Sequence, residues 1–149
     1  MKNILNTLII SVFILIVILL SSCMTAKKKA EMAQNKPLVG TYWVLQKIKG
    51  DPIPQSIAIT PNIVFDSDGK FSGNLGCNLF YGNYSCGKKR IKMEYEGATK
   101  KLCQNMKMEK LLLPYIHADF KRYEIHQDTL VLLDTEGEVL RFFAGVRPE

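Results

Sequence analysis

Hydrophobic and polar positions divide the chain into three regions. Residues 4–20 are predominantly apolar, and no formal charge occurs between residues 3 and 26, which is typical of a targeting segment or a transmembrane helix. Residues 23–37 are rich in lysine and small polar side chains with little to bury, so we expect a flexible tether. Short apolar segments separated by turn residues follow, which predicts one globular domain over residues 38–149.

Most of this domain is predicted to form short β-strands. Residues 41–49 are rich in β-branched and aromatic side chains and stop at Gly50. Residues 90–95 alternate between apolar and charged positions, as expected of a strand with one buried and one solvated face. The predicted strands are residues 41–49, 63–65, 70–74, 82–86, 90–95, 121–126, 130–133 and 139–143.

The hydrophobic period changes to that of a helix over residues 105–119. Five apolar residues recur there at helical spacing, namely Met108, Leu111, Leu112, Tyr115 and Ile116. We expect Asn105 to be the N-cap and Glu109 to place a favourable charge near the helix N-terminus. Pro114 should kink or end the helix, because it removes one hydrogen bond.

The glycine-rich stretch at residues 73–84 links the central strands. Gly73, Gly76 and Gly82 predict a chain that turns sharply yet still passes through the core. Asn78 is expected to hold this turn through its side-chain amide. Eight strands with one helix before the last three predict a mainly β fold, a small antiparallel barrel whose interior holds side chains or one small ligand. An open sandwich is the alternative.

The end of the first apolar segment carries a further signal. Leu20-Ser21-Ser22-Cys23 resembles the lipobox of bacterial lipoproteins, which implies cleavage of residues 1–22 and attachment of lipid to Cys23. The alternative, a permanent span, would keep the domain in the cytoplasm, because three lysines follow the segment and one precedes it. No acidic residue closely follows Cys23, so we expect an outer-membrane anchor facing the periplasm.

The net charge of +6 is modest and does not indicate a nucleic-acid partner, since no Lys/Arg run is interleaved with aromatic residues. We interpret the domain's lysines as a solvated surface. These are Lys88, Lys89, Lys92, Lys100, Lys101, Lys107 and Lys110.

Several motifs occur in a fixed order across residues 40–143. They are Trp43-x-Leu45, Phe65 before an Asp-Gly turn, Gly76-Cys77-Asn78, Gly82-Asn83-Tyr84, Ala98-Thr99-x-x-x-Cys103, Glu109, Tyr123 and Leu130-x-Leu132. This ordered set resembles the META family, which includes HslJ-like heat-shock lipoproteins. The resemblance implies a small lipocalin-like barrel with a helix packed against it, a location in the cell envelope and a link to stress responses. It implies no agreed enzymatic activity. Lys100-Lys101-Leu102 departs from the methionine that the family often has there.

Three cysteines of the domain, Cys77, Cys86 and Cys103, allow three single disulfides. The resemblance favours Cys77–Cys103, because the two matching motifs carry these residues. The sequence has no Cys-x-x-Cys motif, which would indicate redox catalysis. It also lacks the paired ligand spacing of a metal site, and we expect no metal and no cofactor. We expect His117 and His126 to have surface or capping roles.

No catalytic constellation occurs in the sequence. The leading hypothesis is a non-enzymatic lipid-anchored envelope module that binds another envelope protein, in an oligomeric state that the sequence leaves open. The alternative is a carrier of a small apolar ligand inside the barrel. Its aromatic lining would come from Trp43, Phe71, Phe80, Tyr84 and Phe142.

Overall fold

The computed structural model of the protein describes residues 35–54 and 57–148. Residues 36–149 group into one compact unit, and the fold reported below is that of this unit alone. The predicted signal segment, the lipid attachment at Cys23 and most of the predicted tether lie outside the described residues. Within the described part of the chain, no helix has the length and apolar character needed to cross a membrane.

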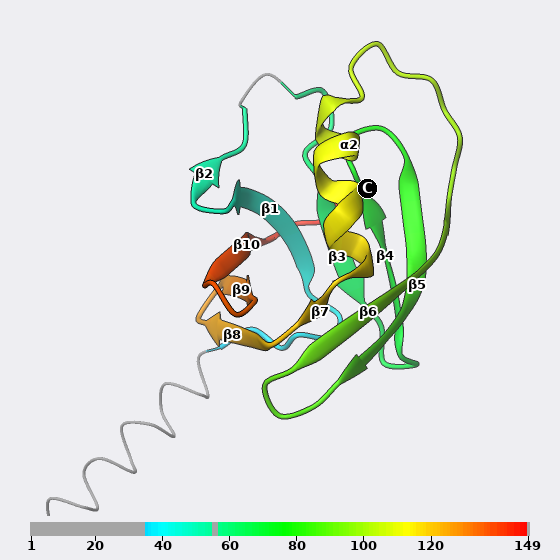
Figure 1. Ribbon diagram of the computed structural model, residues 1–149. Coiled ribbons are helices and arrows are strands. Elements are labelled where there is room, and N and C mark those ends of the chain that lie inside the picture. Colours follow the sequence, from blue (N-terminus) through cyan, green and yellow to red (C-terminus); the bar gives the residue numbers. More distant parts are fainter. Residues whose placement is uncertain (1–34, 55–56, 149) are drawn as a thin grey trace, which may run out of the picture. The chain divides into compact units, whose positions relative to one another are not determined.

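Ten strands and two helical segments make up the described residues (Figure 1). The strands are β1 (Tyr42–Ile48), β2 (Asp51–Pro52), β3 (Asn62–Phe65), β4 (Lys70–Asn74), β5 (Leu79–Cys86), β6 (Ile91–Ala98), β7 (Asp119–Phe120), β8 (Arg122–His126), β9 (Thr129–Leu133) and β10 (Glu138–Gly145). The helical segments are α2 (Lys107–Leu112) and the 3-10 helix η1 (Leu113–His117), both between β6 and β7.

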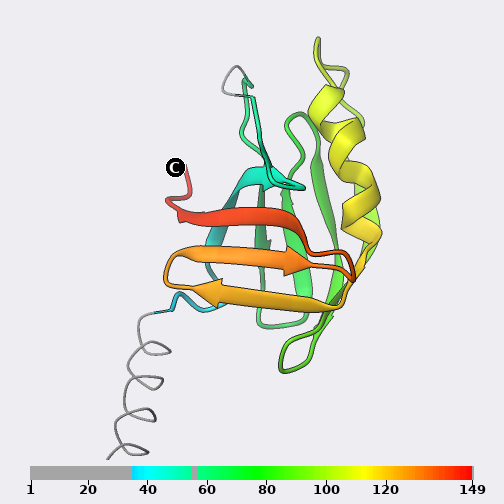
Figure 2. The same cartoon turned by 60° about the vertical axis from the view of Figure 1, so that its left-hand side comes forward.

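The strands form one antiparallel sheet that curls on itself. Their order is β7-β6-β5-β4-β3-β1-β10-β9-β8, and β2 pairs with β1. Lys121 alone separates β7 from β8, which lie at opposite ends of this order, so the two ends of the sheet must meet there. The N–H of Tyr123 in β8 also donates to the carbonyl oxygen of Lys89, in the turn between β5 and β6, at 2.6 Å. This bond is a second link between the two ends of the sheet. The domain is therefore a mainly β, curled half-barrel (Figure 2), which confirms the predicted fold class.

All eight predicted strands are present, and the structure adds two short strands that were not predicted, β2 and β7, so that four strands rather than three follow the helix. Strand β5 begins at Leu79, three residues earlier than predicted, because the glycine-rich sequence of this segment suggested a longer turn. Gly73 lies in β4 and Gly82 in β5, within the predicted strand ranges, and Gly76 is the one of the three that turns the chain, with a positive φ of 104°. A Cβ at Gly82 would lie 2.2 Å from the Glu94 carbonyl oxygen, so glycine is required there for close approach of β6.

The helical segment is shorter than predicted. Helix α2 ends at Leu112 and continues as the 3-10 helix η1, with Pro114 in its first turn, as the proline predicted. The predicted N-cap is wrong: Met106 occupies that position, and the Asn105 side chain accepts a hydrogen bond from the Lys107 N–H just before the first turn. Leu111 is 47% exposed, because so short a helix buries only a narrow stripe.

The core fills the space between the curled sheet and the helix. The fully buried Trp43 side chain is at its centre, and the indole N–H donates to the Leu38 carbonyl oxygen at 3.0 Å, which fixes the chain entering β1. Phe65 and Phe71 pack edge to face, with ring centroids 6.4 Å apart. Met108, Leu112 and Ile116 contribute the buried helical stripe. Helix and strands therefore share a single hydrophobic cluster.

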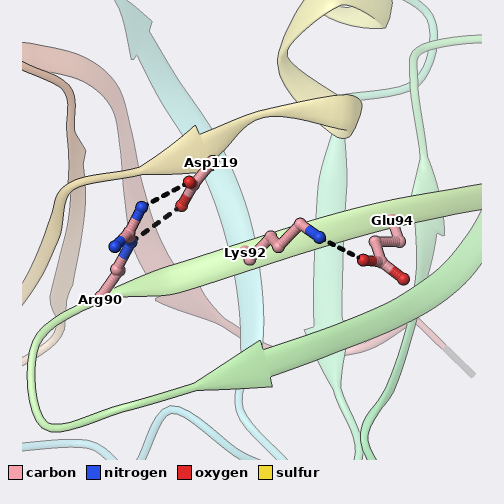
Figure 3. A network of polar contacts seen from close by, with 4 residues as sticks. All are labelled: Arg90, Lys92, Glu94 and Asp119. Atoms are coloured by element: carbon pink, nitrogen blue, oxygen red, sulfur yellow. Dashed lines mark hydrogen bonds and ion pairs between the residues drawn. The ribbon is translucent and has the colours of Figure 1, made fainter.

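An ion pair on the surface ties β6 to β7 (Figure 3). The Arg90 guanidinium donates two hydrogen bonds to the Asp119 carboxylate, at 3.1 and 2.6 Å. These bonds lower the pKa of Asp119 and raise that of Arg90. Lys92 pairs with Glu94 on the same strand at 2.6 Å. The short β7 strand is thus held to its neighbour by side chains as well as by the backbone.

We expect Gly82→Ala to destabilise the domain by about 1–3 kcal/mol, because the added methyl group would overlap the backbone of β6 and the ring of Phe71. Gly87→Ala is the matched control, since a Cβ there meets only the Arg90 carbonyl oxygen at 4.0 Å; its effect should be within about 0.5 kcal/mol. Urea unfolding of both variants measures the difference. Equal stability of the two variants would contradict the close-approach role of Gly82.

Candidate functional site

The polar centre of the domain is the side chain of Asn78, only 2% of which is exposed. Its Nδ2 donates to the Glu109 carboxylate at 2.9 Å and to the Lys101 carbonyl oxygen at 3.2 Å. Its Oδ1 accepts from the Lys101 N–H at 2.7 Å and from the Thr99 hydroxyl at 2.8 Å. We call these four residues the Asn78 network. It joins the turn before β5, the segment after β6 and helix α2.

The turn that carries Asn78 is built for this position. Leu75 is buried, Gly76 has a φ of 104° that favours glycine, and the Gly76 N–H donates to the Asn74 side-chain oxygen at 2.7 Å. The next residue, Cys77, is buried and directly precedes Asn78. The predicted turn role of Asn78 is thus only part of its function, since most of its partners lie outside the turn.

A disulfide between Cys77 and Cys103 stands beside the network, with the two Cα atoms 6.2 Å apart. This is the pairing that the family resemblance implied. In the chain-entropy account, closing a loop of this length lowers the entropy of the unfolded chain and so stabilises the fold by about 3.5 kcal/mol. The disulfide and the Asn78 network together fix the segment between β6 and α2 at both Lys101 and Cys103.

Glu109 and Thr99 have more specific roles than the sequence suggested. Glu109 lies in the first turn of α2, as predicted, but its carboxylate also accepts the Asn78 backbone N–H at 3.1 Å. Thr99 donates to Asn78 and accepts the Leu79 N–H at 3.2 Å, so it closes the β5–β6 ladder. Lys101 is the network member that residue-by-residue reasoning missed. Its backbone makes the contacts, and the side-chain identity gives no signal of that.

The remaining titratable candidates lie apart from this network. Cys86 is exposed and unpaired, and its sulfur lies 3.4 Å from the Tyr123 hydroxyl. Burial, followed by the contact with Cys86, raises the pKa of Tyr123 to about 12. His117 packs against Tyr95 with ring centroids 4.8 Å apart, and His126 is an exposed residue of β8. In the part of the chain that the structure describes, no three His, Cys, Asp or Glu residues gather as metal ligands would.

The barrel interior is closely packed. The cavity inside it measures about 30 Å³, which is the size of one water molecule. A pocket for a small organic ligand is typically about 300–1,000 Å³. Trp43, Phe71, Phe80 and Phe142 are all buried in the core, and Tyr84 packs against it. The structure thus argues against a carrier that holds an apolar ligand inside the barrel.

Fold and polar network together define a small antiparallel half-barrel that is closed by a short helix and locked by one asparagine and one disulfide. The chain belongs to the META domain family, whose sequence model matches residues 36–146. No curated protein gives a significant match to the chain.

Solved structures show the same fold at low sequence identity. A protein from Burkholderia xenovorans, solved by NMR, is 21% identical with a TM-score of 0.58, covering 74% of this chain and 85% of its own. A crystal structure of a DUF4847 family protein from Bacteroides vulgatus is 14% identical with a TM-score of 0.55, covering 75% of this chain and 96% of its own. At these identities the likeness shows the fold alone.

We expect Asn78→Ala to destabilise the domain by about 3 kcal/mol, because it leaves the Lys101 N–H and carbonyl oxygen without their partner and removes the side-chain bond to Glu109, whose carboxylate keeps the backbone N–H of residue 78. Asn83→Ala is the matched control. It removes an exposed side-chain bond to Glu96 and should change stability by less than about 0.5 kcal/mol. Chemical unfolding with the disulfide intact checks both values. A loss of stability for Asn83→Ala as large as that for Asn78→Ala would show that the Asn78 network stabilises the domain no more than an exposed hydrogen bond does.

Proposed function

We propose that this META domain protein is a lipid-anchored protein of the cell envelope that binds another envelope protein through its outer surface and catalyses no reaction. The proposal of a lipid anchor rests on the Leu20-Ser21-Ser22-Cys23 sequence. The proposal of binding through the outer surface rests on the filled interior described above, where the cavity measures about 30 Å³. Recognition of a partner then falls to the outside of the barrel.

The polar groups of the family motifs support the same conclusion. Asn78, Thr99 and Glu109 direct their side chains at one another and at backbone groups. Among the described residues, every deeply buried side-chain nitrogen and oxygen has a hydrogen-bond partner. A site that binds a substrate usually leaves convergent polar groups for it. These groups serve the fold instead.

The outer face of the sheet offers positions at which to test contact. Leu79 and Tyr81 of β5 are 52% and 53% exposed, and Phe143 of β10 is 42% exposed. Tyr81 lies opposite Ser72 of β4 in the sheet. Tyr81, Ser72 and Leu79 line a surface depression that extends to Tyr42. Exposed aromatic residues are enriched in protein interfaces.

The mature protein should carry lipid on Cys23. Intact-mass measurement of protein extracted from membranes should give a chain that begins at Cys23 and is heavier by its acyl chains. Cys23→Ala should abolish that added mass and leave residues 1–22 attached. A wild-type chain that keeps its first 22 residues would overturn the anchoring proposal.

A photoreactive phenylalanine derivative at position 81 should capture an envelope protein when irradiated in cells. The same derivative at position 67, in the exposed β3–β4 turn, is the control, because that turn lies outside the depression described above. Capture of a defined protein at position 81 above the level at position 67 is the expected result. Equal background capture at both positions would argue against recognition through this face.

A further inference from the structure

One leucine of the domain stands almost wholly in solvent. Leu102, in the segment between β6 and α2, is 96% exposed, whereas sequence hydrophobicity alone would place it in the core. The segment lies at the end of the domain where α2 begins (Figure 1). Leu102 follows Lys100 and Lys101, both of which are exposed.

The backbone on each side of Leu102 is fixed. The Lys101 N–H and carbonyl oxygen both bond to the Asn78 side chain, at 2.7 and 3.2 Å. Cys103 is covalently tied to Cys77. A leucine in a loosely held loop could turn toward apolar neighbours, but this one is kept outside by constraints on both flanks. Its exposure is thus a built feature of the fold.

The outward side of the helix continues the same chemistry. Helix α2 buries Met108 and Leu112 against the core. Lys107 and Lys110 are exposed on its other side. We define the lysine–leucine surface as Lys100, Lys101, Leu102, Lys107 and Lys110.

This surface carries positive charge without compensating acids. Among the described residues, none of the salt bridges includes Lys100, Lys101, Lys107 or Lys110. Glu109 is the acidic residue of α2, and its carboxylate is held by Asn78. Four lysines at this end of the domain therefore carry charge that is free to meet an anionic surface.

We propose that the lysine–leucine surface binds an anionic membrane. Leu102 enters the boundary between headgroups and acyl chains, while the lysine ammonium groups reach the lipid phosphates on their flexible stems. Such a contact orients the domain relative to the bilayer. It rests on the proposed anchoring only in that a tether keeps the surface close to lipid and raises its effective concentration.

Composition favours a lipid surface over a protein partner here. Protein interfaces are enriched in arginine and aromatic residues and depleted in lysine. The lysine–leucine surface has four lysines and one leucine, with no arginine and no aromatic residue. Lysine is a compact charge that suits headgroup phosphates without fixed geometry, whereas arginine favours shaped, bidentate recognition. Anionic lipid is the partner that this chemistry matches best.

Tryptophan fluorescence tests the proposal in the full-length chain. Leu102→Trp places a reporter on the surface, while Trp43, the protein's own tryptophan, is buried in the core. The protein is reconstituted into vesicles of neutral or of mixed neutral and anionic lipid, each containing lipids brominated near the headgroup. Quenching of the reporter should be on the order of twofold in anionic vesicles and should weaken in neutral vesicles or at high salt.

Two variants sharpen the test. Lys88→Trp puts the same reporter on the β5–β6 turn, at the other end of these strands from the lysine–leucine surface, and should stay unquenched in every vesicle. Leu102→Trp combined with Lys100→Gln and Lys101→Gln should lose its quenching in anionic vesicles. Those changes keep the backbone bonds of Lys101 to Asn78.

Equal quenching at positions 88 and 102, or none at position 102 in anionic vesicles, would overturn the proposal. So would a photoreactive group at position 102 that captures a protein while the tryptophan reporter stays unquenched, because it would assign the surface to a protein partner. Intact mass reports acylation separately. Quenching without acylation would contradict the anchoring but support this inference.

Discussion

The arrangement of this domain depends on the four hydrogen bonds of one buried amide. An asparagine side chain offers two donors and a carbonyl oxygen with two lone pairs, and burying it without partners is costly. Asn78 meets that demand with Thr99, Lys101 and Glu109, which come from segments more than 20 residues away in the sequence. Its bonds are satisfied only when the turn, the crossing segment and the helix are all in place. One residue thereby couples three local structures into a single fold.

The helix shows how strong that coupling must be. A six-residue helix is marginal in water by itself, because forming its first turn costs more than a single hydrogen bond returns. It lacks a side-chain N-cap bond. Its position comes instead from Glu109 on Asn78, from the disulfide at Cys103 just upstream, and from Met108 and Leu112 in the core. Tertiary contacts therefore define an element that the sequence period only suggested.

Sequence reasoning succeeded where one physical signal dominated. Alternation gave the half-buried strand β6, and the missing N–H of Pro114 marked the end of α2. It failed where the cause lies in another segment: Gly82 is needed because β6 approaches closely, which the local sequence cannot show. The network was found only in part for the same reason. Thr99 came from the family resemblance, and Glu109 came both from it and from its place near the helix N-terminus, whereas the backbone of Lys101 leaves no trace in residue type.

The same rigidity decides where function can reside. Antiparallel barrels of this size hold a ligand only if their inward side chains leave room, and here Trp43, Phe65 and Phe71 fill that room. A fold that is packed inside and locked by Asn78 does not open readily for a ligand, yet it can hold surface side chains in unfavourable positions. Leu102 is such a case, kept in solvent by the bonds that secure its neighbours. The stable interior thus gives the exterior a defined surface, on which the proposed contacts depend.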